Sequence, residues 1–156
     1  MSEETSRKDP GRAGEEVNVE EEFPRCLFLN TVKTARYLTR KYDRKLAPLG
    51  VTTMQYFVMM FLRYNKGRTI NEIASLMDMD RSTLTRNIDG LVRKDLAVKT
   101  MAEKGNGRVC LLTDKGEALL DRLIPIWLEA RESMRKQLAE QDVNEYRTVL
   151  HLLSII

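Results

Sequence analysis

Residues 80–94 carry hydroxyl and guanidinium side chains at a spacing that suits one face of an α-helix. At 100° per residue, Ser82, Arg86 and Arg93 fall on one side. The apolar side chains that fall on the opposite side are Leu84, Ile88 and Leu91. A guanidinium can bridge O6 and N7 of a guanine, and a hydroxyl can bond to base edges or phosphates. The polar face therefore predicts hydrogen bonding to nucleic acid.

The first turn of this helix strengthens the prediction. Ser82 and Thr83 stand where helix propensity disfavours hydroxyl residues, which indicates that these side chains contact something. Asn87 flanks the same face. Asp89 also lies near it and places a negative charge there, beyond the turns that normally enter a DNA groove.

A helix-turn-helix over residues 69–94 is expected to position this face. Thr69 and Glu72 have the spacing of a capping box, in which a hydroxyl and a carboxylate bind the first N–H groups of a helix. The short helix that follows ends near Asp78, and Asp80 is expected to cap the second helix. The expected structure is therefore two helices joined by a tight turn.

After Leu96 the apolar pattern changes to the alternation of β-strands. The runs 98–101 and 108–112 suit strands, and the connection between them contains Asn106-Gly107, which tolerates positive φ. We expect a β-hairpin with a basic tip.

Further helices are predicted on both sides. Apolar residues recur at helical spacing over 23–46, and Pro48 and Gly50 are expected to end that helix. Thr52 or Thr53 would cap the next helix, which ends near residue 65. A third helix should begin at Thr113 or Asp114, run to about residue 137 and be kinked by Pro125, and Asp142 should cap the last. The fold class is mainly α with one hairpin.

The length of the chain and the distribution of its charge limit its possible domain organisation. Its 156 residues suit one domain, and no apolar run approaches the roughly 18 residues of a membrane span. Residues 1–22 hold eight acidic and three basic residues, which leaves a net charge of +8 on the remaining 134. We expect 1–22 to be an acidic disordered tail, with the alternative that it competes with an anionic ligand for a basic surface.

The sequence shows no group of residues suited to catalysis or to metal binding. The chain has one histidine, His151, and neither Cys26 nor Cys110 has a Cys or His neighbour at metal-ligand spacing. Phosphate loops, dinucleotide fingerprints and nucleophile elbows are absent from the sequence. We expect no enzyme activity, metal or cofactor, and a cytoplasmic location because the start lacks a secretory signal.

The arrangement of helix, turn, helix and hairpin is a winged helix-turn-helix, and the sequence resembles the multiple-antibiotic-resistance regulator (MarR) family of bacterial transcription factors. The resemblance covers residues 23–156. Its motifs are Leu49-Gly50-Val51-Thr52-x-x-Gln55-Tyr56, Thr69-Ile70-x-Glu72-Ile73-Ala74, Asp80-Arg81-Ser82-Thr83-Leu84-Thr85-Arg86-x-Ile88-x-x-Leu91 and Leu112-Thr113-x-Lys115-Gly116.

The resemblance implies a homodimer on a near-palindromic operator in double-stranded DNA. Residues 23–47 and 116–156 would form an interleaved helical dimerisation region, and 53–115 would form the DNA-binding lobe, with the wing at 98–113. Arg108 would be the minor-groove arginine of the wing, or else an exposed arginine at a strand end. The DNA-contacting residues implied or suggested are Thr69, Arg81, Ser82, Thr83, Thr85, Arg86, Asn87 and Arg108.

The function expected is a sequence-specific transcriptional regulator of the kind active in stress responses. It would be a repressor released by a small-molecule effector bound between the dimer helices and the winged lobe, without membrane partners. One alternative is a winged helix used only as a protein-interaction or dimerisation module, because a fold does not set its function.

A second alternative lies within the family, some members of which sense peroxides through a cysteine near the start of the first helix. Cys26 lies there, and the positive end of a helix favours a thiolate. A free cysteine is more commonly a small buried apolar residue. We therefore favour a small effector over a redox switch.

Overall fold

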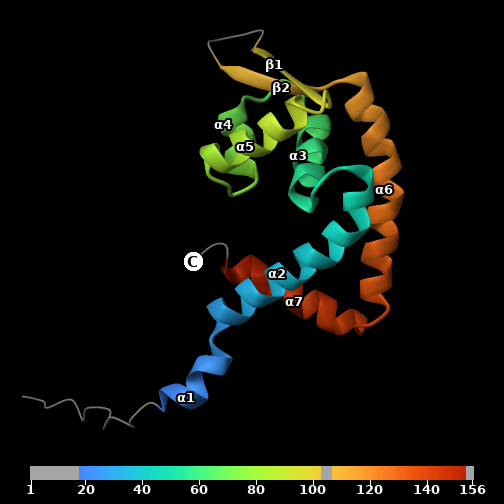
Figure 1. The fold of residues 1–156 in the computed structure, drawn as a ribbon. Coiled ribbons are helices and arrows are strands. Elements are labelled where there is room, and N and C mark those ends of the chain that lie inside the picture. Colours follow the sequence, from blue (N-terminus) through green and yellow to red (C-terminus); the bar gives the residue numbers. More distant parts are fainter. Residues whose placement is uncertain (1–17, 103–106, 154–156) are drawn as a thin grey trace, which may run out of the picture. The chain divides into compact units, whose positions relative to one another are not determined.

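The computed structural model describes residues 18–102 and 107–153. Its helices and strands follow the order α1 (Val19–Glu22), η1 (Phe23–Arg25), α2 (Leu27–Leu46), η2 (Ala47–Leu49), α3 (Thr53–Tyr64), α4 (Ile70–Leu76), α5 (Arg81–Val92), β1 (Ala97–Met101), β2 (Arg108–Leu112), α6 (Asp114–Arg135) and α7 (Glu140–Leu153) (Figure 1). Helices and a single hairpin make up these residues, which confirms the predicted fold class of a winged helix.

The chain divides into two compact units, residues 1–37 and 38–156. In the first unit, Asn18 caps the short helix α1 by accepting a hydrogen bond from the Glu20 amide at 3.1 Å. The last residues of the segment predicted as a disordered tail are thus helical, while residues 1–17 lie outside the described part. The long helix begins at Leu27 and not at Phe23, because residues 23–25 form a separate 3-10 turn that ends at Cys26, whose ψ of 117° is not helical.

In the second unit, α3 begins as the sequence predicts. Gly50 adopts φ 78° and closes the turn after η2, and Thr52 caps α3 in a reciprocal capping box with Gln55. The buried Thr53 is held by Asp43, whose Oδ1 accepts hydrogen bonds from its amide at 2.6 Å and its hydroxyl at 2.7 Å. These contacts set the angle at which the chain leaves α2.

The helix-turn-helix consists of α4 and α5. Thr69 caps α4 in the predicted capping box with Glu72. The turn between the helices passes through Asp78, whose φ of 48° lies in the left-handed region. Asp80 stands at the N-cap of α5 as predicted, but its side chain makes no capping hydrogen bond. The helix ends at Val92, slightly before the predicted end.

The wing is the antiparallel pair β1 and β2, joined in the register Ala97 with Leu112 through Met101 with Arg108. Its predicted basic tip falls at residues 103–106, outside the described residues. An isolated bridge joins Thr69 to Val109. The wing is therefore attached on one side to the start of α4.

Two longer helices follow the wing. Thr113 caps α6 by accepting the Gly116 amide at 3.1 Å, and this helix continues through Pro125 as far as Arg135. The last helix begins at Glu140, two residues before the predicted cap. Asp142 instead occupies the first turn and reaches back, its Oδ2 accepting the Ala139 amide at 3.3 Å.

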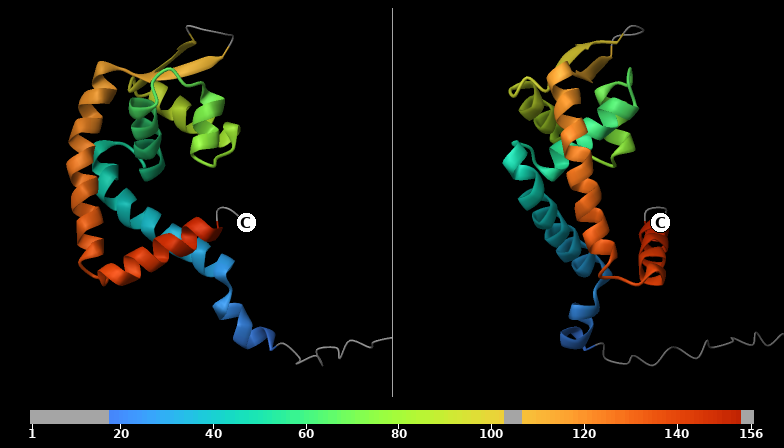
Figure 2. Two further views of the ribbon diagram at one scale, coloured as in Figure 1. Left: turned by 180° about the vertical axis from the view of Figure 1, so that it is seen from behind. Right: turned by 90° about the vertical axis from the view of Figure 1, so that its right-hand side faces the viewer.

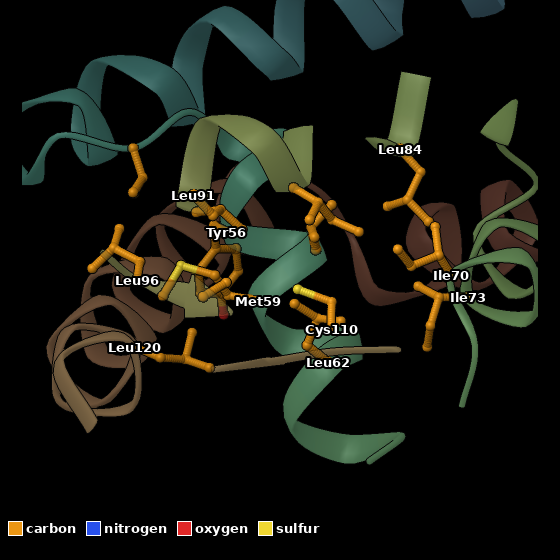
Figure 3. Close-up of a cluster of buried hydrophobic side chains, with 14 of the residues drawn as sticks. Tyr56, Met59, Leu62, Ile70, Ile73, Leu84, Leu91, Leu96, Cys110 and Leu120 are labelled. Carbon is orange, nitrogen blue, oxygen red and sulfur yellow. The ribbon is translucent and has the colours of Figure 1, made fainter. Parts of the chain in front are cut away.

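The core of the second unit lies between α3, α5, the wing and the first half of α6. Its side chains are nearly inaccessible to solvent, and they include Leu46, Tyr56, Met59, Ile73, Leu84, Ile88, Leu91, Leu120 and Leu123. Figure 3 shows part of this cluster, in which the side chains of Tyr56, Met59, Leu91 and Leu120 come from several elements and the sulfur of Cys110 lies among the buried groups. Figure 2 shows, from two sides, that α3 to α5 and the wing gather along one half of α6. This packing holds α5 with its other face outward.

Tight contacts lock the wing to α6. The Thr113 amide donates to the Leu96 carbonyl at 3.1 Å, and its hydroxyl donates to the Asp95 carbonyl at 2.8 Å. A Cβ on Gly116 would lie 2.0 Å from the Leu96 oxygen, so only glycine fits there. The Leu-Thr-x-Lys-Gly motif therefore joins the wing to the helix that follows it.

Candidate nucleic-acid interface

The outward side of α5 presents polar side chains, and the opposite side of the helix is apolar and packs into the core. Leu84, Ile88 and Leu91 have no exposed surface, which confirms the face predicted to be buried. Ser82 and Arg86 are exposed on the opposite side. Arg81 is also exposed, and Thr83, Thr85 and Asn87 are half-buried at the edges of this surface.

We call the surface formed by Arg81, Ser82, Thr83, Thr85, Arg86 and Asn87 the α5 polar face. Within it, the Arg86 guanidinium donates to the Thr83 hydroxyl at 3.1 Å. The Asn87 amide nitrogen donates to the Thr83 carbonyl at 2.9 Å, within its own helix. Arg86 is thereby held against its own helix while its side chain stays exposed, whereas one donor of Asn87 is already in use.

The negative charge of Asp89 has a partner. Lys99 of β1 donates to the Asp89 carboxylate, and both side chains are only partly exposed. The ion pair joins α5 to the wing and offsets the acidic charge near the α5 polar face. Sequence periodicity placed Asp89 near this face but contained no signal for its partner, because Lys99 lies on a different element.

Thr69 lies at the start of α4, where the sequence predicts a phosphate contact. Its amide and hydroxyl both donate to the Glu72 carboxylate, at 2.7 and 2.8 Å. These two hydrogen bonds lower the pKa of Glu72, and Arg68 adds a smaller effect in the same direction. Both donors of Thr69 are thus engaged, so a phosphate would have to displace an exposed carboxylate to use them.

Arg108 is exposed at the first position of β2, and only Gly107 separates it from residues 103–106, which lie outside the described part. A Cβ on its neighbour Gly107 would lie 2.4 Å from the Thr69 methyl group, so the wing passes close to the start of α4. The eight predicted residues therefore occupy three places: the α5 polar face, the start of α4 and the wing.

The two cysteines differ in environment. Cys26 is exposed and lies between η1 and the first residue of α2, at a helix start as the sequence predicts. Cys110 is buried in β2, and burial raises the pKa of its thiol to about 11. Cys110 is therefore protonated and poorly reactive at neutral pH.

A cavity of about 70 Å³ lies between the end of α2 and the second half of α6. Its lining includes Tyr42, Lys45 and Met134. Pockets for drug-sized ligands are usually about 300–1,000 Å³. In one copy of the chain this cavity is too small for such a ligand.

Residues 18–102 and 107–153 lack the side-chain clusters of a metal site and the long apolar helices of a membrane span. In those ranges, no group of three or more His, Cys, Asp or Glu side chains is arranged to hold a metal ion. None of the helices there is both long enough and apolar enough to cross a membrane.

Taken together, α4, α5 and the wing form a winged helix-turn-helix, with its second helix presenting hydroxyl and guanidinium groups outward. This is the architecture of DNA-binding proteins whose second helix enters the major groove.

Comparison with known proteins agrees with this class. Residues 49–108 match the model of the MarR family. The HTH-type transcriptional regulator BilQ of Clostridioides difficile (strain CD3) is 23% identical over 116 residues, which are 73% of this chain and 78% of that protein.

Solved structures extend the likeness over most of the chain. The M. tuberculosis transcriptional regulator MosR in complex with DNA has a TM-score of 0.72 and 26% identity, covering 83% of this chain and 96% of that one. The S. aureus MepR–DNA complex has a TM-score of 0.75 and covers 84% and 98%, and at 21% identity it shows the shared fold alone. The chain is therefore similar to MarR-family regulators, by its sequence over residues 49–108 and by its fold over most of its length.

Proposed function

We propose that this protein is a transcriptional regulator that binds double-stranded DNA in a sequence-specific way. The observation that carries the proposal is the α5 polar face, exposed on a helix whose other side is fully buried in a winged lobe. A transcriptional regulator similar to this chain, M. tuberculosis MosR, was solved in complex with DNA. Such a regulator acts on the chromosome, hence in the cytoplasm, by binding and without catalysis.

Ser82, Thr83 and Arg86 would enter the major groove, and Arg81, Thr85 and Asn87 would contact its edges. Arg86 is the residue best suited to a guanine, because Thr83 holds its guanidinium in place before binding. Arg108 would reach the adjacent minor groove from the wing. Thr69 is proposed as a phosphate contact through the start of α4, conditional on displacement of Glu72.

A homodimer is the proposed assembly. The helix α7 has no buried residue, and Tyr146, Val149 and Leu153 share one side of it with large exposed fractions. A second copy that covers this side would remove apolar surface from water. It would also bring two winged lobes onto a near-palindromic operator.

We further propose repression that a small-molecule effector relieves. Because the cavity between α2 and α6 is small in one copy, we expect the effector site to be completed by the dimer. The exposed Cys26 supports the alternative of a cysteine-based peroxide sensor.

An organic hydroperoxide titrated into the operator complex separates these two forms of regulation. We expect that hydroperoxide does not release the DNA and that Cys26→Ser changes nothing. Release by hydroperoxide that disappears in Cys26→Ser would instead establish the redox switch.

DNA binding itself is tested with random duplex DNA and with the promoter of the protein's own gene. We expect the binding constant for random duplex to fall steeply with salt, because lysines and arginines release counterions from phosphates. A footprint on the promoter would identify the operator. No binding to either DNA would favour the second candidate, a winged helix used only for protein interaction.

A further inference from the structure

The wing is held between the two helices of the helix-turn-helix. On one side, the bridge from Thr69 to Val109 joins β2 to the start of α4. On the other, the Asp89–Lys99 ion pair joins the last turns of α5 to the middle of β1. At the base of the wing, the Leu96 amide donates to the Leu91 carbonyl at 3.0 Å.

The strand register relates this ion pair to Arg108. Lys99 is paired with Cys110, and Met101 is paired with Arg108. Side chains two residues apart on a strand, and those of directly paired residues, share one side of the sheet. Lys99 and Arg108 therefore lie on the same side of the wing, with roughly 7 Å of strand between their positions.

Asp89 belongs to the same helix as the α5 polar face, and Lys99 belongs to the same strand pair as Arg108. The ion pair therefore links the helix that carries the α5 polar face to the strand pair that carries Arg108. We propose that the Asp89–Lys99 ion pair positions Arg108 relative to the α5 polar face, which makes Asp89 a positioning residue for DNA recognition.

The proposal rests on the proposed function and adds a coupling to it. A carboxylate near phosphates would by itself weaken DNA binding, so Asp89→Asn has two opposing effects. Loss of a negative charge strengthens binding to any DNA sequence. Loss of the tether weakens the contribution of Arg108, because the arginine is no longer held at the groove.

A double-mutant cycle between Asp89 and Arg108 separates the two effects. The duplex is first selected from a random library by the full-length wild-type protein, and its dissociation constant is measured at one salt concentration beside a scrambled duplex. The variants are Asp89→Asn, Arg108→Ala and the two together. Additivity is the expectation for residues that do not influence each other.

We expect Arg108→Ala to weaken binding to the selected duplex about 10-fold in the wild-type background and less than about 3-fold in the Asp89→Asn background. The conservative variant Asp89→Glu should restore most of the coupling. The matched control is Asp95→Asn, which removes the same charge from an exposed ion pair with Lys115. In that background Arg108→Ala should keep its full effect.

Equal losses in the wild-type and Asp89→Asn backgrounds would overturn the proposal. Asp89→Asn could instead strengthen binding to the selected and the scrambled duplex by the same factor and leave the cost of Arg108→Ala unchanged. That result would mean that Lys99 only neutralises the charge of Asp89 and does not position Arg108. If Asp89→Asn does not fold by circular dichroism, Lys99→Met replaces it in the cycle with the same expectations. Failure of the wild-type protein to select any duplex would refute the proposed function, and this proposal with it.

Discussion

The winged lobe and the last helix differ in how they bury apolar side chains. In the lobe, Leu84, Ile88 and Leu91 of α5 are inaccessible to solvent. In α7, Tyr146 and Val149 are each 46% exposed, although their spacing is as regular as that of the lobe. The lobe completes its core within one chain, whereas α7 has no buried residue and presents an exposed apolar side. This difference supports the proposal that the lobe recognises DNA and that α7 serves assembly.

The largest effect is expected in the core of the lobe. Leu84→Ala should lower the free energy of unfolding by about 2–5 kcal/mol, because it removes a fully buried side chain and leaves a cavity. Leu76→Ala on α4, where the side chain is 47% exposed, is the control and should cost less than about 1 kcal/mol. Urea denaturation measures both. Equal losses of unfolding free energy in the two variants would mean that Leu84 is not buried in a packed core.

The next effect concerns α7. Val149→Glu should raise the dissociation constant of the dimer about 100-fold or more, because each copy then buries a carboxylate in an apolar interface. Asn144→Glu, on the opposite side of the helix, should leave the constant nearly unchanged. Sedimentation at a series of concentrations gives both values. A wild-type protein that is monomeric at micromolar concentration with full helicity would contradict the assembly.

A smaller effect is expected where α3 meets α6. Arg63 donates from Nε to Glu117 Oε2 at 2.5 Å, from Nη1 to Asp121 Oδ1 at 2.7 Å and from Nη2 to the Glu117 carbonyl at 2.8 Å. Arg63→Met should cost about 1–3 kcal/mol of unfolding free energy, because a half-buried carboxylate loses its donors.

Arg63→Lys tests whether the geometry of the guanidinium matters. A lysine keeps the charge, but its donors all lie on one nitrogen and cannot reach the separate acceptors that Arg63 contacts from three nitrogens, so it should recover less than about half of the loss. Full recovery by lysine would show that charge alone joins the two helices. Thermal unfolding at fixed protein concentration provides the comparison.

The smallest effect is expected at Tyr56. Its side chain is fully buried, its hydroxyl has no hydrogen-bond partner in the described part of the chain, and burial raises its pKa to about 12. Tyr56→Phe should leave the free energy of unfolding unchanged or raise it by up to about 1 kcal/mol. Tyr64→Phe, at an exposed position, is the control. A loss greater than about 1 kcal/mol would mean that the hydroxyl binds a buried water molecule.

Local features of the fold were predictable from the sequence. The caps at Thr52 and Thr69 and the two sides of α5 depend on residues within a few positions of one another, so spacing alone identifies them. The start of α2 at Leu27 was not predicted, because apolar spacing does not separate the 3-10 turn of residues 23–25 from the helix that follows it. The last helix begins before Asp142. A carboxylate in the first turn can accept a hydrogen bond from an amide at the helix start, as Asp142 does from Ala139, so an aspartate there does not have to be the N-cap.

Contacts between distant segments were not predictable. The pairing of Asp89 with Lys99 depends on the angle between α5 and the wing, which no local pattern contains. The same holds for Arg63, which contacts residues more than fifty positions away. At Thr69 the capping box was predicted, but its consequence for phosphate binding became visible only with both donors placed on Glu72.

The most direct test of the α5 polar face is the operator discrimination of Arg86→Ala. Binding of the wild-type and variant proteins to the selected operator and to random duplex is measured at the same salt concentration. Loss of the guanidinium should cost about 1–3 kcal/mol on the operator and little on random DNA, because a base contact is lost while phosphate attraction remains. If Arg86→Ala discriminates the operator from random duplex as well as the wild-type protein does, α5 does not read the DNA sequence.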